Sequence, residues 1–286
     1  MPLLVCVGHV TWDRTEKGRV LGGPVSYAAA TAGKLGWEVG VLTAAGPDFE
    51  ASRDLPVAQV ACRPSSSTTS FRNVYAPDGA RTQFVSSRAE DIDLSLLPEA
   101  WRRPDALLLG PVVGEIPGAA ASAFEAGVVG AEGQGWLREI DAEGRVSARD
   151  WPDPTRDLAG VDALFFSEQD LPRGGRLAPA YLGSVPMVAL TRGVEGLSLL
   201  TRESNHTIPS LPRTEVDPTG AGDVFTAAFL IRYHESRDPL KAAAFAACAG
   251  SCAVEKVGVS TLGDREEIER RQATRQWFIE DGERDE

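Results

Sequence analysis

The sequence predicts an α/β fold in which helices cover both faces of a mostly parallel sheet. From residue 105 onward, short apolar runs of strand length alternate with runs of helical spacing, and such repeated units build parallel sheets. A Gly-rich turn, D-P-T-G-A-G-D, opens a long apolar helix in the C-terminal half. The chain has 286 residues, enough for one large core. We therefore expect a single domain over residues 1–286.

Composition and charge exclude several classes of partner. A hydrophobic fraction of 43% with 24% charged residues is typical of an ordinary globular protein. The formal charge of -12 leaves no positive field for a polyanion, so we expect no nucleic-acid partner. The sequence contains no apolar run long enough to span a bilayer, and the start M-P-L-L-V-C-V-G lacks a basic leader. We expect a cytoplasmic protein without a membrane partner.

The N-terminal part predicts a strand, a turn and a helix. Residues 3–8 form a short apolar run that ends in glycine, as expected of a buried strand. Asp13 follows just beyond its end, where open α/β sheets bind ligands, although turns and caps also use such a residue. Gly22 and Gly23 precede a proline that suits the first position of an Ala-rich helix.

The middle of the chain predicts a hairpin and then further strands. After a strand at residues 38–43, the segments T-T-S-F-R-N-V-Y and R-T-Q-F-V alternate on either side of the turn A-P-D-G-A. Strands follow at 106–110, 127–131 and 163–166, with a helix near 118–126. The run V-A-L-T-R-G-V-E-G-L-S-L-L predicts a strand, a Gly turn and a second strand.

The D-P-T-G-A-G-D turn carries the chemistry that is easiest to recognise. Gly220, Ala221 and Gly222 stand at a helix N-terminus, where free N–H groups and the helix dipole favour an anion. Asp223 follows them directly. Its carboxylate can cap the helix or, beside a bound phosphate, accept a proton. The residues alone leave both interpretations open.

The full seven-residue motif resembles the signature of the ribokinase-like carbohydrate kinases, the phosphofructokinase-B family. The resemblance runs in the same order along nearly the whole chain. It implies a ribokinase-like three-layer sandwich with a central mostly parallel sheet and a small β lid. The lid would be formed by insertions at approximately residues 14–21 and 57–87, and it would close over the acceptor and exclude water.

The resemblance also implies an ATP-dependent kinase that transfers the γ-phosphoryl group to a hydroxyl of a small sugar or cyclitol. Mg²⁺ would bridge the phosphates, and catalysis would depend on positioning and charge stabilisation. Asp223 would accept the proton of the hydroxyl. The amides of Gly220, Ala221 and Gly222 would hold the developing charge.

The family's motifs place the other expected site residues. The acceptor would be bound by Asp13, Gly22, Gly23, Tyr27, Gln134 and Arg138. The nucleotide would be bound by Thr191, Gly193 and Gly196, which resemble the family's nucleotide loop, and by Gly258 in a later loop. Asp170, with Ser167, stands where the family has N-x-x-E, and would hold Mg²⁺ through water. Asp217 and Thr219 would contribute to a monovalent-cation site for K⁺, which some members have.

Two departures from the sugar-kinase pattern indicate which kind of molecule accepts the phosphoryl group. Tyr27 stands where many sugar kinases carry Asn, and Gln134-Gly-Trp-Leu-Arg138 is similar to the inositol-kinase branch, so myo-inositol is the first candidate. One alternative is a nucleoside kinase in which Trp12, Tyr27 or Phe84 stacks on a base. Another is a catalytically silent nucleotide- or sugar-binding regulator. Lid edges in this fold can pair between subunits, which allows a homodimer, and the sequence does not settle which hydroxyl is phosphorylated.

Overall fold

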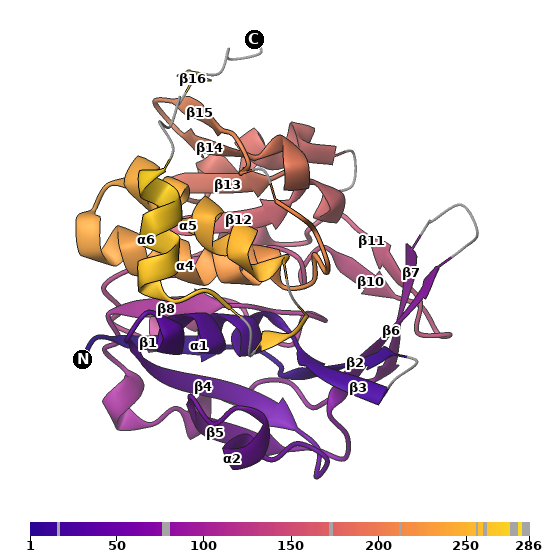
Figure 1. Ribbon diagram of the computed structural model, residues 1–286. Helices are drawn as coiled ribbons and strands as arrows, with labels where there is room; N and C mark the ends of the chain where they lie inside the picture. Colours follow the sequence, from indigo (N-terminus) through magenta and orange to yellow (C-terminus); the bar gives the residue numbers. More distant parts are fainter. Residues whose placement is uncertain are drawn as a thin grey trace.

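A ten-stranded sheet forms the centre of the molecule (Figure 1). The structure is a computed structural model that describes residues 1–15, 18–75, 81–171, 174–211, 213–255, 257–259, 262–274 and 280–281. In order across the sheet, the strands are β16 (Glu280–Asp281), β15 (Asn205–Ile208), β14 (Leu197–Thr201), β13 (Met187–Thr191), β12 (Ala163–Ser167), β9 (Val129–Glu132), β8 (Ala106–Leu109), β1 (Leu3–Val7), β4 (Glu38–Ala45) and β5 (Gln59–Pro64).

The strands from β5 to β13 are parallel, and β14, β15 and β16 extend the sheet with antiparallel pairs. The central strands are apolar along their length, as in L-L-V-C-V of β1 and A-L-L-L of β8, because both of their faces are covered. This is the mostly parallel α/β sheet that the sequence predicted. Within the described part of the chain, no helix is both long and apolar enough to cross a membrane.

The long helices gather on one face of this sheet (Figure 1). Helix α4 (Ala221–Ser236) lies between α1 (Pro24–Lys34) and α5 (Pro239–Ala253), and α6 (Arg265–Ala273) packs against α5. A proline occupies the first turn of both α1 and α5. The Asp238 side chain caps α5 by accepting hydrogen bonds from two backbone amides.

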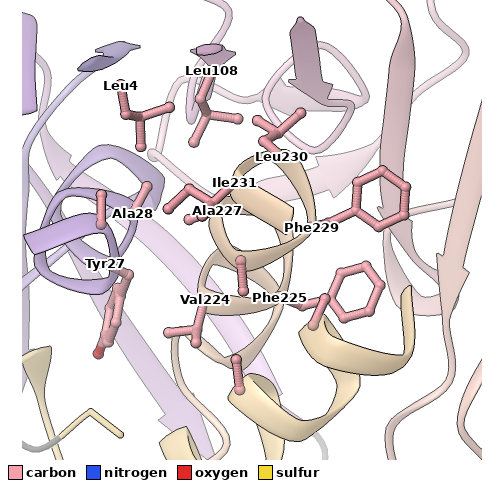
Figure 2. Packing of buried hydrophobic residues seen from close by; sticks show 14 of the residues in the cluster. Leu4, Tyr27, Ala28, Leu108, Val224, Phe225, Ala227, Phe229, Leu230 and Ile231 are labelled. Atoms are coloured by element: carbon pink, nitrogen blue, oxygen red, sulfur yellow. The ribbon is translucent and has the colours of Figure 1, made fainter. Parts of the chain in front are cut away.

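Residues 224–231 of helix α4 are buried around the whole circumference of the helix, because protein surrounds this part (Figure 2). Phe229, Leu230 and Ile231 are completely buried. On β9, Gly130 leaves room for Leu230, since a Cβ at Gly130 would lie 2.7 Å from the Leu230 Cδ2 atom. The absence of a side chain at that strand position therefore lets α4 pack closely on the sheet.

The opposite face of the sheet is covered by shorter elements than the sequence suggested. A helix was expected near residues 118–126, but the structure forms only the 3₁₀ helix Ala120–Ala123 there. The segment begins with Pro117 and Gly118, and Ala119 has a left-handed φ of 56°, so only one turn forms. The remaining short helices are α2 (Ala51–Asp54), α3 (Pro154–Asp157) and the 3₁₀ helices Leu94–Leu96, Glu99–Trp101, Glu168–Asp170, Gly174–Gly183 and Gly193–Glu195.

A small four-stranded sheet stands beside the C-terminal ends of the parallel strands (Figure 1). Its order is β3 (Gly18–Gly22), β2 (Thr11–Thr15), β6 (Thr69–Tyr75) and β7 (Arg81–Ser87). Because β5 pairs with the large sheet, only the later part of the expected range 57–87 belongs to this small sheet. The A-P-D-G-A turn, residues 76–80, lies outside the described residues.

A hairpin from the main body reaches the small sheet. Strands β10 (Arg138–Ile140) and β11 (Val146–Ala148) pair with each other in antiparallel fashion. At the hairpin turn, the Gly144 carbonyl accepts a hydrogen bond of 2.7 Å from the Val85 amide of β7. Phe84 of β7 also forms a bridge with Arg145. The hairpin and the small sheet are thus joined through their backbones.

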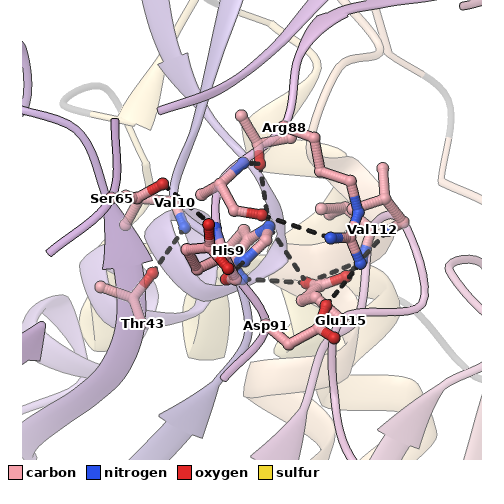
Figure 3. A network of polar contacts seen from close by, with 12 residues as sticks. His9, Val10, Thr43, Ser65, Arg88, Asp91, Val112 and Glu115 are labelled. Carbon is pink, nitrogen blue, oxygen red and sulfur yellow. Dashed lines mark hydrogen bonds and ion pairs between the residues drawn. The ribbon is translucent and has the colours of Figure 1, made fainter. Parts of the chain in front are cut away.

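A buried polar network fixes the base of the small sheet, where the chain leaves and re-enters the core (Figure 3). His9 lies between β1 and β2, and its ring contacts the Thr69 hydroxyl at 2.9 Å and the Glu90 carbonyl at 2.8 Å. Glu115, which is 1% exposed, accepts hydrogen bonds from the amides of His9, Val112 and Val113. This network holds β2, β6 and the end of β7 in place.

We expect the substitution Glu115→Gln to destabilise the fold. Both oxygens of Glu115 accept backbone N–H groups, so an amide nitrogen must face a donor in either orientation. The free energy of unfolding should fall by about 2–4 kcal/mol, as measured by urea denaturation. Glu125→Gln is the matched control, because the Glu125 side chain is 73% exposed and forms an ion pair with exposed Arg103. Equal unfolding midpoints for the two variants would refute this role of the Glu115 carboxylate.

Candidate active site

One cavity of about 450 Å³ opens between the small sheet, the ends of the parallel strands and the N-terminus of α4. It brings together residues far apart in the sequence. The predicted site residues that line it are Asp13, Gly23, Tyr27, Gln134, Arg138, Asp170, Thr191, Gly193, Gly196, Asp217, Thr219, Gly220, Ala221, Gly222 and Asp223. Among the described residues, Gly22 and Gly258 were also predicted for the site but do not line the cavity.

The turn before α4 forms one wall of the cavity. Gly220 is the N-cap residue with a left-handed φ of 79°, and a Cβ there would overlap the Tyr27 ring. Only glycine satisfies both conditions. The Ala221 amide donates to the Pro218 carbonyl at 3.3 Å, whereas the described residues provide no acceptor for the amides of Gly220 and Gly222. These two amides are therefore available to an anion at the helix N-terminus.

Asp223 lies in the first turn of α4, next to several other carboxyl groups. Burial raises its pKa to about 6, and the charges of Asp170 and Asp13 add to the rise. A hydrogen bond from Glu132 and the positive charge of Arg138 oppose it. At neutral pH, Asp223 is therefore a carboxylate with a raised affinity for protons, which is the property that a general base requires.

Tyr27 lies where the two halves of the cavity meet. The side chain is 3% exposed, and its ring packs on Gly220. Burial raises the pKa of its hydroxyl, and Asp223, Asp13 and Asp217 raise it further, in that order. The Tyr27 hydroxyl thus faces carboxylates from both the small sheet and the turn before α4.

The small sheet supplies the other wall. Asp13 lies on β2, and a Cβ at Gly22 on the neighbouring strand would overlap its carboxylate. Gly22 therefore makes room for Asp13, although it does not itself line the cavity. Gly23 has a φ of 87° and begins α1, and a Cβ there would lie 2.8 Å from the His9 carbonyl oxygen. Both positions therefore require glycine, because a side chain would collide with Asp13 at the first and with the His9 carbonyl at the second.

Residues after β9 and β12 meet at the floor of the cavity. The Gln134 amide donates to Asp170 at 3.0 Å, and the other oxygen of Asp170 accepts from the Ser167 amide at 2.9 Å. Arg138 donates to the Val112 carbonyl at 3.1 Å, and its guanidinium lies 5.5 Å from the centre of the Phe71 ring. Asp170 therefore caps its own short helix, and its binding of Mg²⁺ stays a prediction.

The far end of the cavity is formed by the loop after β13. The Thr191 hydroxyl donates to the Phe166 carbonyl at 3.1 Å, while Gly193 and Gly196 have positive φ values of 53° and 95°. Lys256, Ser260 and Thr261, which flank the described residues 257–259 in the expected loop, lie outside the described residues. Gly258 is described, with a φ of 83°, and its binding of a nucleotide stays a prediction. The Asp217 carboxylate accepts from the Thr219 amide at 3.0 Å, and a monovalent-cation site there also stays a prediction.

Several residues that line the cavity were not among the site residues expected from the sequence. Asn73 and Gln83 face each other across β6 and β7 and are hydrogen bonded at 3.2 Å. Because side chains alternate between the two faces along each strand, the sequence of the hairpin could have predicted that Asn73 and Gln83 lie on the same face of the small sheet. Glu132 ends β9, and Arg213 precedes the Gly-rich turn. Within the described part of the chain, no group of three His, Cys, Asp or Glu side chains is arranged to hold a metal ion.

Comparison with known proteins supports the interpretation of the motif. The family model described as pfkB family carbohydrate kinase matches residues 162–265. A nucleoside kinase of Methanocaldococcus jannaschii is 32% identical over 103 residues, which are 34% of this chain and 34% of the relative. The ribokinase of Bacillus subtilis is 33% identical over 108 residues, or 37% of this chain and 35% of the relative. The matched segments thus span about a third of these curated relatives.

Solved structures match over almost the whole chain. A pyrophosphate-dependent kinase in the ribokinase family, complexed with a pyrophosphate analog and myo-inositol, has a TM-score of 0.77 at 24% identity and covers 93% of this chain and 99% of its own. The ribokinase of Arabidopsis thaliana, complexed with ribose and ATP, has a TM-score of 0.71 at 21% identity, with 95% and 98% covered. At this identity the likeness establishes the fold. The chain therefore has the ribokinase-like fold, and its residues 162–265 match the pfkB family of carbohydrate kinases.

Proposed function

We propose that this protein transfers a phosphoryl group from a phosphoanhydride donor, ATP in the first instance, to a hydroxyl of a small sugar or cyclitol. The observation that carries the proposal is the position of Asp223. Its carboxylate lines the same cavity as the free amides of Gly220 and Gly222 and as Asp13 on the small sheet. A base, an anion-binding turn and a polar acceptor wall thus share one enclosed space.

In this mechanism the chain's own residues position the reactants and move one proton. The amides of Gly220 and Gly222 stabilise negative charge on the transferred group, while Ala221 mainly holds the turn. Asp223 accepts the proton of the attacking hydroxyl. Asp13 orients the acceptor from the small sheet. The polar network under β2 keeps Asp13 in place, since His9 and Thr69 join the two strands at their base.

A divalent ion fits this site only through water. Mg²⁺ usually retains several water ligands and is held by one or two carboxylates together with substrate phosphates. Asp170 is the residue that would hold it, since each of its oxygens makes one hydrogen bond and keeps a lone pair for a water ligand. When bound, the ion would neutralise charge on the phosphate oxygens.

Polar side chains favour a polyol as the acceptor. Asp13, Asn73 and Gln83 from the small sheet and Gln134 and Arg138 from the main body line the acceptor side. Such a set offers both donors and acceptors to several hydroxyl groups. A structural neighbour of 24% identity was solved with myo-inositol, which supports the choice of a cyclitol as first candidate.

The nucleoside-kinase alternative depends on an aromatic side chain that stacks on the base. Two of the three candidates are engaged elsewhere and do not line the cavity: the Arg19 guanidinium lies 4.2 Å from the centre of the Trp12 ring, and the Arg72 guanidinium lies 4.9 Å from that of Phe84. The third, Tyr27, packs its ring on Gly220. These contacts favour the cyclitol or sugar over the nucleoside.

The test is phosphoryl transfer by the purified protein. We expect turnover with myo-inositol or a related polyol in a panel of sugars, cyclitols and nucleosides, with ATP and pyrophosphate compared as donors because a structural neighbour is pyrophosphate-dependent. Asp223→Asn should lower kcat by about 10²–10⁴-fold, because the amide cannot accept the proton. Donor affinity, measured by calorimetry, should change little. Undiminished turnover in this variant would rule out Asp223 as the base.

The activity should depend on pH through Asp223. Its pKa is raised to about 6, so the carboxylate is protonated below that pH and cannot act as a base. We therefore expect log kcat/KM to fall with unit slope as the pH decreases below about 6 and to level off above it. We call the falling part of this profile the acid limb. A profile that stays flat down to pH 4.5 would contradict this assignment.

A further inference from the structure

Glu132 is a buried carboxyl group that the mechanism above does not use. It is the last residue of β9 and lines the cavity. The residue is 7% exposed, and its Oε1 atom has no conventional hydrogen-bond partner among the described residues. A buried acceptor without a donor is costly, so the group calls for a physical explanation.

The close packing of α4 on β9 explains its position. Gly130 and Glu132 point to the same side of β9, because side chains alternate along a strand. Gly130 faces Leu230 of α4, and Glu132, two residues further along, faces the first turn of the same helix. Glu132 therefore lies next to Asp223 and Thr226, and all three residues line the cavity.

The surroundings of Glu132 suit a neutral acid and not a carboxylate. The Thr226 hydroxyl already donates to the Gly222 carbonyl at 3.0 Å, so it is poorly available as a donor to an anion. Asp223 can only accept while it is ionised. Burial raises the pKa of Glu132 well above its usual value, and the charges of Asp223 and Asp170 raise it further.

We propose that Glu132 is a positioning residue for the reaction: its neutral carboxyl group donates a hydrogen bond to the Asp223 carboxylate and holds it toward the acceptor. The proposal rests on the proposed function, in which Asp223 is the base. Two carboxyl groups that share one proton are a stable arrangement where two anions would repel each other. The hydrogen bond also keeps Asp223 ionised at neutral pH, against the effect of burial.

Other charged or titratable groups face this pair, and the experiment must account for them. Asp223 is influenced by Asp170 and Asp13, whose charges raise its pKa, and by Arg138, whose charge lowers it. On the sheet side, the buried Cys6 thiol lies close to Glu132. Tyr27 faces the pair from α1. None of these groups is altered in the variants below.

Glu132→Gln and Glu132→Leu separate the proposed role from simple packing. Glutamine keeps a donor to Asp223, so kcat should stay within about threefold of wild type and the acid limb should not move. Leucine removes the donor. We expect kcat to fall about 10- to 100-fold through misplacement of the base and the acid limb to move up by about one pH unit.

Glu168→Gln is the matched control. Glu168 directly follows β12, as Glu132 ends the neighbouring strand, but it is 47% exposed at the side chain and lies 3.6 Å from Arg192. Its activity and pH profile should equal those of wild type. If Glu132→Gln and Glu132→Leu lose activity equally with no shift of the acid limb, Glu132 is a packing residue and the proposal fails. A downward shift of the limb in both variants would mean that Glu132 is ionised, which also overturns it.

A second measurement does not depend on turnover and so separates this proposal from the proposed function. The raised pKa of Asp223 in the folded protein means that stability falls as pH rises through its range. Neutral Glu132 also releases a proton on unfolding in this range, so both Glu132→Gln and Glu132→Leu remove that part of the fall. Between the two variants, the loss of melting temperature from pH 4 to pH 8 should be larger for Glu132→Leu, because glutamine keeps the donor to Asp223. In the Asp223→Asn background this difference between the two variants should disappear. If the difference is the same in both backgrounds, the two residues are not coupled.

Discussion

The arrangement of the site depends on one packing constraint, the close approach of α4 to the central sheet. Gly130 leaves the space that Leu230 fills, and residues 224–231 of the helix are buried on all sides (Figure 2). Because the helix axis is fixed against β9, its first turn stands at the carboxyl ends of the parallel strands. The Gly-rich turn before α4 therefore faces the crevice where open α/β sheets bind ligands.

The same constraint concentrates acidic groups. Asp223, Glu132 and Asp170 come from a helix, a strand end and a short helix, and each of them affects the pKa of at least one of the others. Gathering carboxyl groups in a partly buried cavity opposes folding at neutral pH, because charge is removed from water and placed beside like charge. The core around α4 offsets this cost. Sites whose groups have strongly perturbed pKa values are characteristically functional.

The sequence was sufficient for the local features of the fold and site. The turn before α4 was predictable because a Gly-rich stretch in front of an apolar helical run indicates a turn at a helix N-terminus. The parallel sheet was predictable because its strands are short apolar runs that alternate with helical segments. Pairings between distant segments were not predictable. Asn73 and Gln83 reach the cavity only because β6 pairs with β2 in one register, and a shift by one residue would have pointed both away. The role of Glu132 required knowledge of how closely α4 approaches β9. On the second face, the helix expected near residues 118–126 was shortened by its own proline and glycine.

The bond between the Val85 amide and the Gly144 carbonyl has a mechanical consequence. Arg138 begins the hairpin whose turn contains Gly144, and it pairs across that hairpin with Ala148. Any outward swing of β7 must therefore either break this backbone bond or pull the hairpin with it. In the second case, the pull reaches Arg138, whose guanidinium donates to the Val112 carbonyl of the main body at 3.1 Å. A movement of the small sheet is therefore transmitted to the floor of the cavity through the hairpin.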